Sequence, residues 1–561
     1  MHAYAVEARL NWLGATATVI CFGYLVSRVF TGIDFTDEMQ HYGELTSLVV
    51  TGKLFQVDLF LQQAMYVFLY PVFRLYYLVA GGWDYLVIAG RTFMLIAYAA
   101  AAWLAYRRSA TESARYPGWA AAGVVLAWLP FNILSPYYNA VAGLLISLIV
   151  FVWAGEARAR AYLVVSTLAV SMLCVTYPTL GLAVGALLVG DELLARRYGL
   201  AVRMIALLAG FGSLWAAILW SMTGSLTDIR DAVTFSKAFG VGYAFSNAGH
   251  LRILFVVVLA GMAFSYLGAR QERTDRMLNG YIALPLGLGL SWWLAGREGW
   301  LLVALLYIGV LFLLRYVPAD APEKRQVARL GVFGLLIGAV SALTSGNGVI
   351  NIAIGVGAVL PYLVGLILKG CAIPVSSADG AVPKLRLAHL AMLVGVLLVA
   401  NNFLHPYRDK PVWELGHSLD RVPAFRGIIG SEEKRVAVEL VQGLAASPAL
   451  LEGGTLLVVG PQPWVYFALG ATPQTPMLFM HYSGGTAATR IVADRLFRQA
   501  RPGRILVMSQ PPAEIMAALD RGLRSGYRCD VLTVKLPAGE TGRAMEKFGL
   551  GPEMKMCRLG A

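Results

Sequence analysis

Long apolar runs recur through most of this chain of 561 residues, and they constrain its fold more than any other feature. A helix needs about 17–25 apolar residues to cross the hydrocarbon core of a bilayer. The sequence therefore predicts an α-helical polytopic membrane protein with about 13 transmembrane helices. The thirteen runs are 11–30, 84–106, 118–135, 139–155, 161–177, 179–194, 203–222, 250–268, 277–296, 299–316, 329–345, 349–368 and 386–404.

The charged residues indicate the same class of protein. They make up only 14% of the chain, against roughly a quarter in soluble domains, which excludes a soluble globular enzyme. The net charge of +13 is divided among small clusters between the apolar runs, so it does not indicate nucleic-acid binding. Basic clusters in short loops mark the cytoplasmic side of a membrane. Six clusters occupy alternate loops: Arg107/Arg108/Arg115, Arg158/Arg160, Arg196/Arg197/Arg203, Arg270/Arg273/Arg276, Arg315/Lys324/Arg325/Arg329 and Lys369/Lys384/Arg386.

The same clusters predict which apolar runs cross the membrane. If Arg9 is cytoplasmic, one of the three runs before Arg107 does not cross, and 61–80 is the best candidate because polar residues and Pro71 interrupt it. We expect this run to form an interfacial hairpin within a first outer loop, residues 31–83. Thirteen crossings place the N-terminus in the cytoplasm and the C-terminus outside, in a multi-pass protein of the cell (inner) membrane. Fourteen crossings would place the N-terminus outside.

Residues 405–561 differ from the transmembrane domain, 1–404, because they are polar and marked by Pro and Gly turns. Apolar strands alternate there with helix-like segments, which predicts an extracytoplasmic α/β domain with a largely parallel sheet. No glycine-rich phosphate loop accompanies it, so nothing indicates a nucleotide site. Cys529 and Cys557 both lie in this domain, where they either pair or remain two free thiols. The expected strands are 455–460, 477–483, 504–509 and 529–536, and the expected helices are 431–446, 485–500 and 512–525.

The densest acidic patch on the predicted outer side follows the first span directly, in IDFTDEMQHYGELTSLVV (33–50). Thr36 suits an N-cap and predicts a helix from Asp37 to about Val50, with an amphipathic character suited to the membrane interface. A competing interpretation is that the acidic residues only favour the helix dipole. A metal site is a third interpretation, but no second ligand pair is visible. Four polar side chains share one stripe of this helix: Asp37, Gln40, His41 and Glu44.

The order of features around this patch is distinctive. A first span is followed by the acidic pair Asp37–Glu38, an interfacial helix, the apolar hairpin YVFLYPVFRLYYLVAGGWD (66–84) and Arg91 at the start of the next span. This order resembles the GT-C membrane glycosyltransferases, most closely the branch with protein O-mannosyltransferases and lipid A aminoarabinose transferases. The resemblance covers the first 110 residues. It departs from the family at the hairpin, which has a single Pro71 where relatives often carry Lys-Pro-Pro.

The resemblance implies an inverting glycosyltransferase that uses a polyprenyl-phosphate sugar as donor. The sugar would pass to a lipid, glycan or protein acceptor on the outer face of the membrane. Asp37 matches the first acidic position of the family and is expected to be the general base, with Glu38 supporting it or binding the acceptor. Lys53, Arg74 and Arg91 are the candidates to bind the donor phosphate, although each is equally suited to snorkel toward the interface.

Further residues are candidates to bind substrate. His41 and Glu44 belong to the polar stripe of the first outer loop. Tyr137, Tyr138 and Asn139 follow a Ser-Pro turn between two spans and are able to stack on or hydrogen-bond a sugar, or to belong to the aromatic belt. We expect no required cofactor and assign no metal ligand, and a single acidic pair gives little support for a divalent cation. The expected partners are the lipid-linked sugar, the acceptor and membrane lipids, with no nucleic acid.

Two other functions compete with glycosyl transfer. A transporter or flippase of a lipid-linked or anionic solute would carry ionisable residues within its spans, and these spans are nearly free of them. An outer-leaflet polysaccharide polymerase or ligase would also use polyprenyl-linked glycans. Such proteins usually carry their large loop later in the chain, whereas the acidic residues here cluster in the first outer loop.

Overall fold

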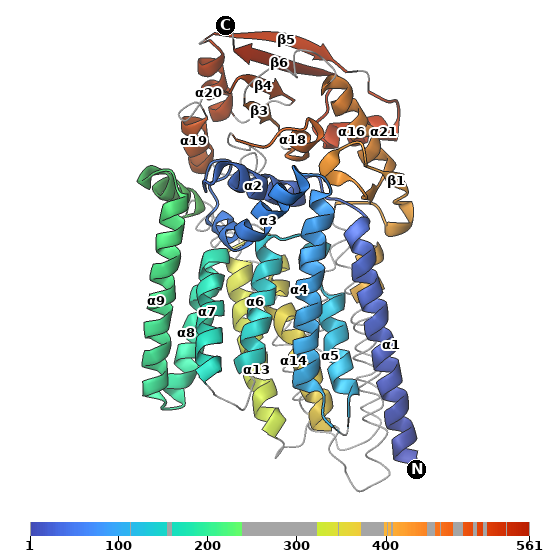
Figure 1. The fold of residues 1–561 in the computed structure, drawn as a ribbon, viewed down its shortest axis with the longest axis vertical. Coiled ribbons are helices and arrows are strands. Elements are labelled where there is room, and N and C mark those ends of the chain that lie inside the picture. The colour runs from blue at the N-terminus through green and yellow to red at the C-terminus, as the bar shows by residue number, and fades with distance from the viewer. Residues whose placement is uncertain are drawn as a thin grey trace.

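Helices make up most of the protein, and a small sheet lies near the C-terminal end. The start of the first helix and the end of the last strand lie at opposite ends of the molecule (Figure 1). The computed structural model describes residues 2–112, 114–153, 160–237, 322–345, 347–371, 398–400, 402–404, 408–445, 455–460, 462–474, 486–496, 502–508, 513–524, 526–534 and 536–559.

A bundle of helices forms the larger part of the molecule (Figure 1). Among the described residues, five helices are long and apolar enough to cross a membrane: α1, α4, α9, α13 and α14. The predicted runs 250–268, 277–296 and 299–316, and most of 386–404, lie outside the described residues. The helices of the bundle are α1 (His2–Phe30), α4 (Leu86–Ser109), α5 (Tyr116–Ala127), α6 (Tyr138–Trp153), α7 (Arg160–Thr176), α8 (Pro178–Leu194), α9 (Tyr198–Met222), α13 (Pro322–Leu343) and α14 (Ile352–Cys371), with the 3₁₀ turn η4 (Gly348–Asn351) before α14.

Small residues let the central helices approach one another closely. A Cβ atom on Gly355 of α14 would overlap the backbone of Gly338 in α13, and one on Gly357 would overlap the ring of Trp128. Such close backbone contact is typical of helix packing between apolar surfaces. Glycine at these two positions is therefore required for α14 to occupy the centre of the bundle.

The hydropathy predicted one continuous helix over 118–135, but the structure has a break in this run. Helix α5 ends at Ala127, and the 3₁₀ turn η2 (Pro130–Asn132) follows. Pro130 has no N–H to continue the helical ladder, and both Phe131 and Asn132 have positive φ. Two asparagine side chains provide hydrogen bonds to backbone carbonyl groups at this break. Asn402 donates to the carbonyl of Ala127 over 3.0 Å, and Asn132 donates to the carbonyl of Asn402 over 2.8 Å.

The first loop, residues 31–83, lies across the end of the bundle that faces the sheet (Figure 1). Its helix α2 (Asp37–Thr51) has the predicted bounds within one residue and ends at Gly52, which has a left-handed conformation. The run 61–80 forms the turn η1 (Leu61–Met65) and helix α3 (Tyr66–Ala80), with Pro71 inside the helix.

The C-terminal region contains a four-stranded sheet with the order β3 (Leu456–Val459), β4 (Arg504–Val507), β6 (Glu553–Leu559) and β5 (Tyr527–Thr533). The prediction of a largely parallel sheet is wrong for the described strands: β3 and β4 are parallel, but β6 is antiparallel to both β4 and β5. The prediction of a parallel sheet failed because it did not include β6. This strand, which has both exposed and buried residues, lies between β4 and β5. The expected strand 477–483 lies outside the described residues.

The elements of this region otherwise follow the predicted alternation of strands and helices. In chain order they are η6 (Val412–Glu414), β1 (His417–Ser418), η7 (Pro423–Phe425), β2 (Ile429–Gly430), α16 (Glu432–Ala445), β3 (Leu456–Val459), α18 (Trp464–Ala468), α19 (Thr486–Arg495), β4 (Arg504–Val507), α20 (Ala513–Leu523), β5 (Tyr527–Thr533), α21 (Glu540–Lys547) and β6 (Glu553–Leu559). Strands β1 and β2 pair separately as a short antiparallel ribbon.

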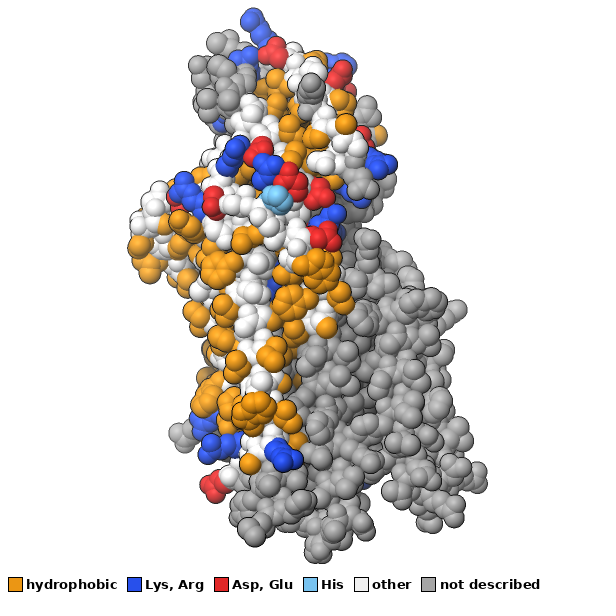
Figure 2. Space-filling model, turned by 90° about the vertical axis from the view of Figure 1, so that its right-hand side faces the viewer, with side chains coloured by type: hydrophobic (Ala, Val, Ile, Leu, Met, Phe, Trp, Pro, Cys, Tyr) orange, Lys and Arg blue, Asp and Glu red, His pale blue; other side chains and the backbone are white. Residues whose placement is uncertain are grey.

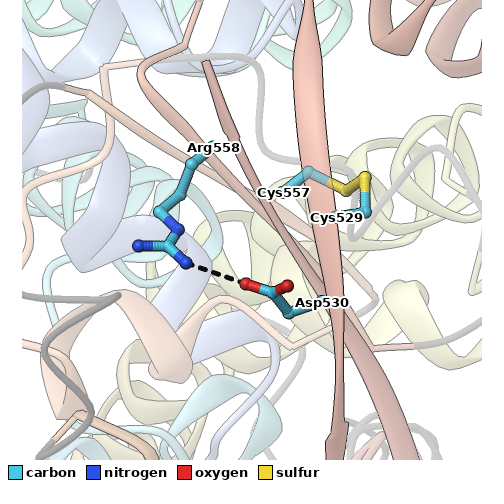
Figure 3. Close-up of a disulfide and its surroundings, with 4 residues drawn as sticks. All are labelled: Cys529, Asp530, Cys557 and Arg558. Atoms are coloured by element: carbon cyan, nitrogen blue, oxygen red, sulfur yellow. Dashed lines mark hydrogen bonds and ion pairs between the residues drawn. A yellow bond between two sulfur atoms is a disulfide. The ribbon is translucent and has the colours of Figure 1, made fainter. Parts of the chain in front are cut away.

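A disulfide joins the two antiparallel strands at the C-terminal end of the chain (Figure 3). Cys529 of β5 and Cys557 of β6 are directly paired residues, so the alternative of two free thiols does not hold in this structure. Beside the disulfide, Arg558 and Asp530 form an exposed ion pair over 2.8 Å. The covalent link therefore joins an exposed part of β5 to Cys557, which is buried in the core of the C-terminal region.

The first loop and the C-terminal region share one hydrophobic core. Phe35 stacks on Trp464 with ring centroids 4.5 Å apart, and the ring of Phe425 lies 6.0 Å away. The backbone N–H of Gly32 donates to the carbonyl of Ile429 over 2.8 Å. The first loop thus lies before the predicted domain boundary at 404/405 in the sequence, but it packs against the C-terminal region that follows this boundary.

Candidate functional site

The N-terminus of α2 is held by a reciprocal pair of carboxylates. Asp34 accepts the backbone N–H of Glu38 over 3.1 Å, and Glu38 accepts the backbone N–H of Asp34 over 2.9 Å. Asp34 also accepts hydrogen bonds from Thr36, which occupies the predicted N-cap position but makes no capping bond with its own side chain. This arrangement satisfies the first free N–H groups of the helix and fixes the direction of the residues that follow.

Glu38 forms a buried, two-pronged ion pair with Arg91. Nε and Nη2 of Arg91 donate to the two carboxylate oxygens of Glu38, each over 2.9 Å, and the side chains are 2% and 1% exposed. Ser135 donates a further hydrogen bond to Glu38, and Arg91 donates to the carbonyl of Arg28 over 3.0 Å. The pair therefore joins α1, α2, α4 and the turn before α6.

The surroundings of Glu38 keep it ionised. Burial alone would raise its pKa, but the charge of Arg91 and the hydrogen bonds from Arg91 and Ser135 leave the pKa below the ordinary value. Every oxygen of this carboxylate is occupied. Glu38 and Arg91 consequently serve to position α2, and the structure leaves neither of them exposed to a substrate.

Asp37, the adjacent residue, has a different environment. Its side chain is 26% exposed, and its Oδ1 lies 3.1 Å from Nη1 of Arg408, which is 46% exposed. The same Arg408 nitrogen also donates to the hydroxyl of Thr36. Asp37 is therefore the accessible carboxylate of the pair, and its partner comes from the start of the C-terminal region.

Asp34 lies between these two environments. Burial raises its pKa to about 6, and the negative charge of Asp37 contributes to the shift in the same direction. Hydrogen bonds from Thr36 and the positive charge of Arg408 act against the shift. Asp34 consequently changes its protonation state at a mildly acidic pH, next to the exposed Asp37.

A second group of acidic side chains lies one turn further along α2. Nε2 of Gln40 donates to both Glu44 and Asp58 over 2.9 Å, and all three side chains are buried. Asp58 also accepts the backbone N–H of Leu59 over 2.6 Å. Burial raises the pKa of Glu44 above its ordinary value, although the hydrogen bond from Gln40 acts against the shift.

His41 lies inside a ring of tyrosines. Its Nδ1 is 2.8 Å from the hydroxyl of Tyr66 and 3.5 Å from Oε2 of Glu44. The ring centroids of Tyr137 and Tyr138 are each 5.7 Å from that of His41. Burial lowers the pKa of His41 although nearby carboxylates oppose the shift, so the imidazole is neutral at neutral pH. The structure thus brings four of the five predicted substrate-binding residues together.

The fifth predicted substrate-binding residue, Asn139, is buried in the first turn of α6. It follows Tyr138 directly, so it lies at the edge of the same tyrosine ring. Within the described residues, no group of three His, Cys, Asp or Glu side chains is arranged to hold a metal ion. His41 and Glu44 therefore have no third metal ligand among those residues.

Two of the predicted phosphate-binding cations lie far from Asp37. Arg74 donates to the carbonyl of Val49 over 2.9 Å, in the last turn of α2, and Lys53 follows the end of that helix as an exposed residue. A helix rises 1.5 Å per residue, so Asp37 and Val49 are separated by roughly 18 Å along α2. Arg91, the third predicted cation, is closer but is occupied by Glu38.

Several residues that build this site are not among those predicted from the sequence. Ser135 and Asp58 bind the residues of α2 directly, and Arg408, Asp409 and Lys434 reach it from the C-terminal region. The sequence signal for the residues of the C-terminal region is the charged triplet 408–410, which follows the last predicted span after three residues. A triplet of charges at that place is equally typical of a solvated linker.

An apolar cavity of about 570 Å³ opens among α7, α8, α9 and η1. Its walls are almost entirely aliphatic or aromatic, and η1 connects it to the first loop. The lining residues include Leu61, Val170, Cys174, Gly185, Trp215 and Leu219.

Comparison with known proteins does not place the chain in a family. No protein-family model matches it, and no curated protein matches it. The functional argument therefore depends on the residues and on their geometry.

Proposed function

We propose that the protein is a membrane glycosyltransferase of the GT-C type. It moves a sugar from a polyprenyl-phosphate donor to a lipid, glycan or protein acceptor at the outer face of a cell membrane. The observation that carries this proposal is the division of the adjacent acids on α2: Glu38 is buried and fully bonded, whereas Asp37 is accessible at the end of the helical bundle. A helix so firmly held can present one carboxylate to a substrate with little loss of orientation.

The surface supports a membrane location. Figure 2 shows apolar side chains covering the helices of one face, with charged side chains gathered between these helices and the sheet. Arg107 and Arg108 end α4 and Lys369 lies in the last turn of α14, as expected for cytoplasmic helix ends. In this proposal the bundle has thirteen crossings, the N-terminus is cytoplasmic, and the C-terminal region with the first loop is extracytoplasmic.

The reaction assigned to the site is a single displacement. Asp37 accepts the proton of an acceptor hydroxyl or amine while that oxygen or nitrogen attacks the anomeric carbon of the sugar. The bond from the anomeric carbon to the phosphate oxygen breaks, and the polyprenyl phosphate leaves with the bonding electrons. Because attack and departure occur on opposite faces of the sugar, the anomeric configuration inverts.

The surrounding residues suit the other parts of such substrates. The neutral His41 and the tyrosines around it offer stacking faces and hydrogen-bonding groups of the kind that bind sugars. The apolar cavity among α7, α8 and α9 matches the chemistry of a polyprenyl chain.

The Asp37→Asn variant tests the proposal. We expect sugar transfer from a polyprenyl-phosphate sugar to fall by about 10²–10⁴-fold, because the amide cannot accept the proton. Asp530→Asn is the matched control, since it makes the same change at an exposed position of β5. Thermal unfolding should give midpoints close to that of the wild type for both variants, because both substitutions are at partly exposed ion pairs. Near-normal transfer by a folded Asp37→Asn protein would overturn the assignment of the base.

The same assay separates the alternative functions. Turnover in detergent, where no two compartments exist, would exclude transport as the whole function. A donor preference for a pyrophosphate-linked oligosaccharide over a monophosphate-linked monosaccharide would indicate a polymerase or ligase instead.

A further inference from the structure

Arg408 is the cation that contacts the accessible carboxylate of the site. Its Nη1 lies 3.1 Å from Oδ1 of Asp37, and about half of the side chain is exposed. A guanidinium group offers several N–H donors in one plane, so one group can bind a carboxylate and a phosphate on different edges. Arg408 therefore offers a positive charge directly beside the candidate base.

The residues assigned to the phosphate from the sequence do not meet this need. Arg91 is 2% exposed and gives two of its hydrogen bonds to Glu38, so binding a phosphate would break a buried ion pair. Arg74 and Lys53 are located at the other end of α2, roughly 18 Å away along the helix. An inverting displacement needs the base and the leaving phosphate on opposite sides of a single sugar ring, and that distance is too large for it.

The backbone of Arg408 is fixed although its side chain is accessible. The next residue, Asp409, forms a buried ion pair with Lys434 over 2.8 Å, and both side chains are 2% exposed. Asp409 accepts the backbone N–H of Ile33 over 2.9 Å, while Lys434 donates to the carbonyl groups of Ile33 and Arg408. This pair ties Arg408 and Asp409 to the loop just before α2.

The backbone conformation of Arg408 supports a functional role. Its φ is +49°, in the left-handed region that residues with a Cβ atom rarely adopt. Such a conformation is unfavourable for a residue with a Cβ atom, and it persists only where the surroundings impose it. Here the buried pair of Asp409 and Lys434 imposes it, and the result is that the guanidinium of Arg408 faces Asp37.

We infer that Arg408 binds the phosphate of the lipid-linked donor and acts as a catalytic residue together with Asp37. The inference rests on the proposed function. When the donor binds, its phosphate takes hydrogen bonds of Arg408, and Oδ1 of Asp37 becomes available to accept the proton of the acceptor. The positive charge then stabilises the phosphate as the sugar leaves it.

The test measures binding of two probes to the full-length protein in nanodiscs. The probes are polyprenyl monophosphate, which is the expected leaving group, and the polyprenol of the same chain length, which lacks the phosphate. We expect wild type to prefer the phosphate, and Arg408→Ala and Arg408→Gln to lose that preference by at least tenfold while binding the alcohol as before. The conservative Arg408→Lys should retain part of it.

Arg421→Ala is the matched control, because Arg421 is 67% exposed, belongs to the same region and pairs with Glu439. It should bind both probes as the wild type does. In turnover assays Arg408→Gln should raise the KM for the donor, with the KM for the acceptor little changed, which a purely structural defect would not produce.

The outcomes separate the inference from the proposed function. An unchanged preference for the phosphate in folded Arg408→Ala and Arg408→Gln overturns the inference and leaves the proposed function standing. A wild-type protein that prefers no polyprenyl phosphate over polyprenol overturns both.

Discussion

Two arginine–carboxylate pairs begin one residue apart on α2 and have opposite characters. Glu38 and Arg91 are almost completely buried and are bonded through two parallel hydrogen bonds. Asp37 and Arg408 are partly exposed, and Arg408 donates to Asp37 over 3.1 Å although 371 residues separate them in the sequence. Adjacent acids of the same chemical type thus acquire different roles from their surroundings, one of them structural and the other available for chemistry.

The two pairs should also differ in energy. A buried charge that loses its partner remains unpaired in a medium of low polarity, so breaking such a pair costs about 3–5 kcal/mol. An exposed pair is screened by water, and its loss costs about 0–1 kcal/mol. Substitutions of one partner at a time therefore test whether Glu38 and Asp37 differ in this way.

The largest effect is expected from Arg91→Met. It leaves Glu38 buried without its partner, and the free energy of unfolding should fall by about 3–5 kcal/mol. The measurement is denaturant unfolding of the protein in detergent. The double variant Glu38→Met/Arg91→Met removes both charges and should recover most of that loss. If the double variant is as unstable as Arg91→Met, the cost does not arise from an unpaired charge.

A smaller effect is expected from the pH dependence of Asp34. Its pKa is about 6 in the folded protein, raised by burial, against 3.8 as the ordinary value. The folded state therefore binds the proton more tightly, and the free energy of unfolding should fall by roughly 2 kcal/mol as the pH rises from about 4 to about 6. Asp34→Asn should remove this fall. The measurement is the difference between wild type and variant across that pH range.

An outcome with the opposite slope would contradict the burial of Asp34. In that case the ionised form would be the one that the folded protein favours, as it is for Glu38. Asp34 would then resemble Glu38, as a buried carboxylate that the folded protein keeps ionised.

The smallest effect on stability is expected at the exposed pair. Arg408→Ala and Asp37→Asn should each lower the free energy of unfolding by less than about 1 kcal/mol, because water already screens both charges. Unfolding measurements on both variants test this directly. A loss above 3 kcal/mol at either position would show that the pair is structural, and the difference between Asp37 and Glu38 would disappear.

Much of the local structure could be predicted from the sequence. The bounds of α2 follow from an acidic first turn and an apolar continuation, and the structure agrees within one residue. The break after Ala127 was missed because hydropathy averages over Pro130, whose missing N–H ends the helix. The antiparallel β6 was missed because its exposed and buried residues mix, and such a strand resembles a polar tail.

The partners of the site could not be predicted, for a different reason. Arg408 and Lys434 reach the first loop across 371 and 401 residues, and no periodicity along the chain reports contacts of that range. Conversely, Arg74 and Lys53 are close to Asp37 in sequence but lie at the opposite end of the same helix. Distance along the sequence is therefore a poor guide here. Arg408 is remote in sequence but contacts the candidate base, whereas Arg74 and Lys53 are closer in sequence but lie far from it.

The shared core of the first loop and the C-terminal region has a consequence for biosynthesis. Lys434 follows Ile33 by 401 residues, and at about 5–20 residues per second a ribosome needs roughly 20–80 s to make them. During that interval Phe35 and its neighbours have been synthesised but lack the aromatic partners that later cover them. The core that the first loop shares with the C-terminal region is therefore completed only late in translation.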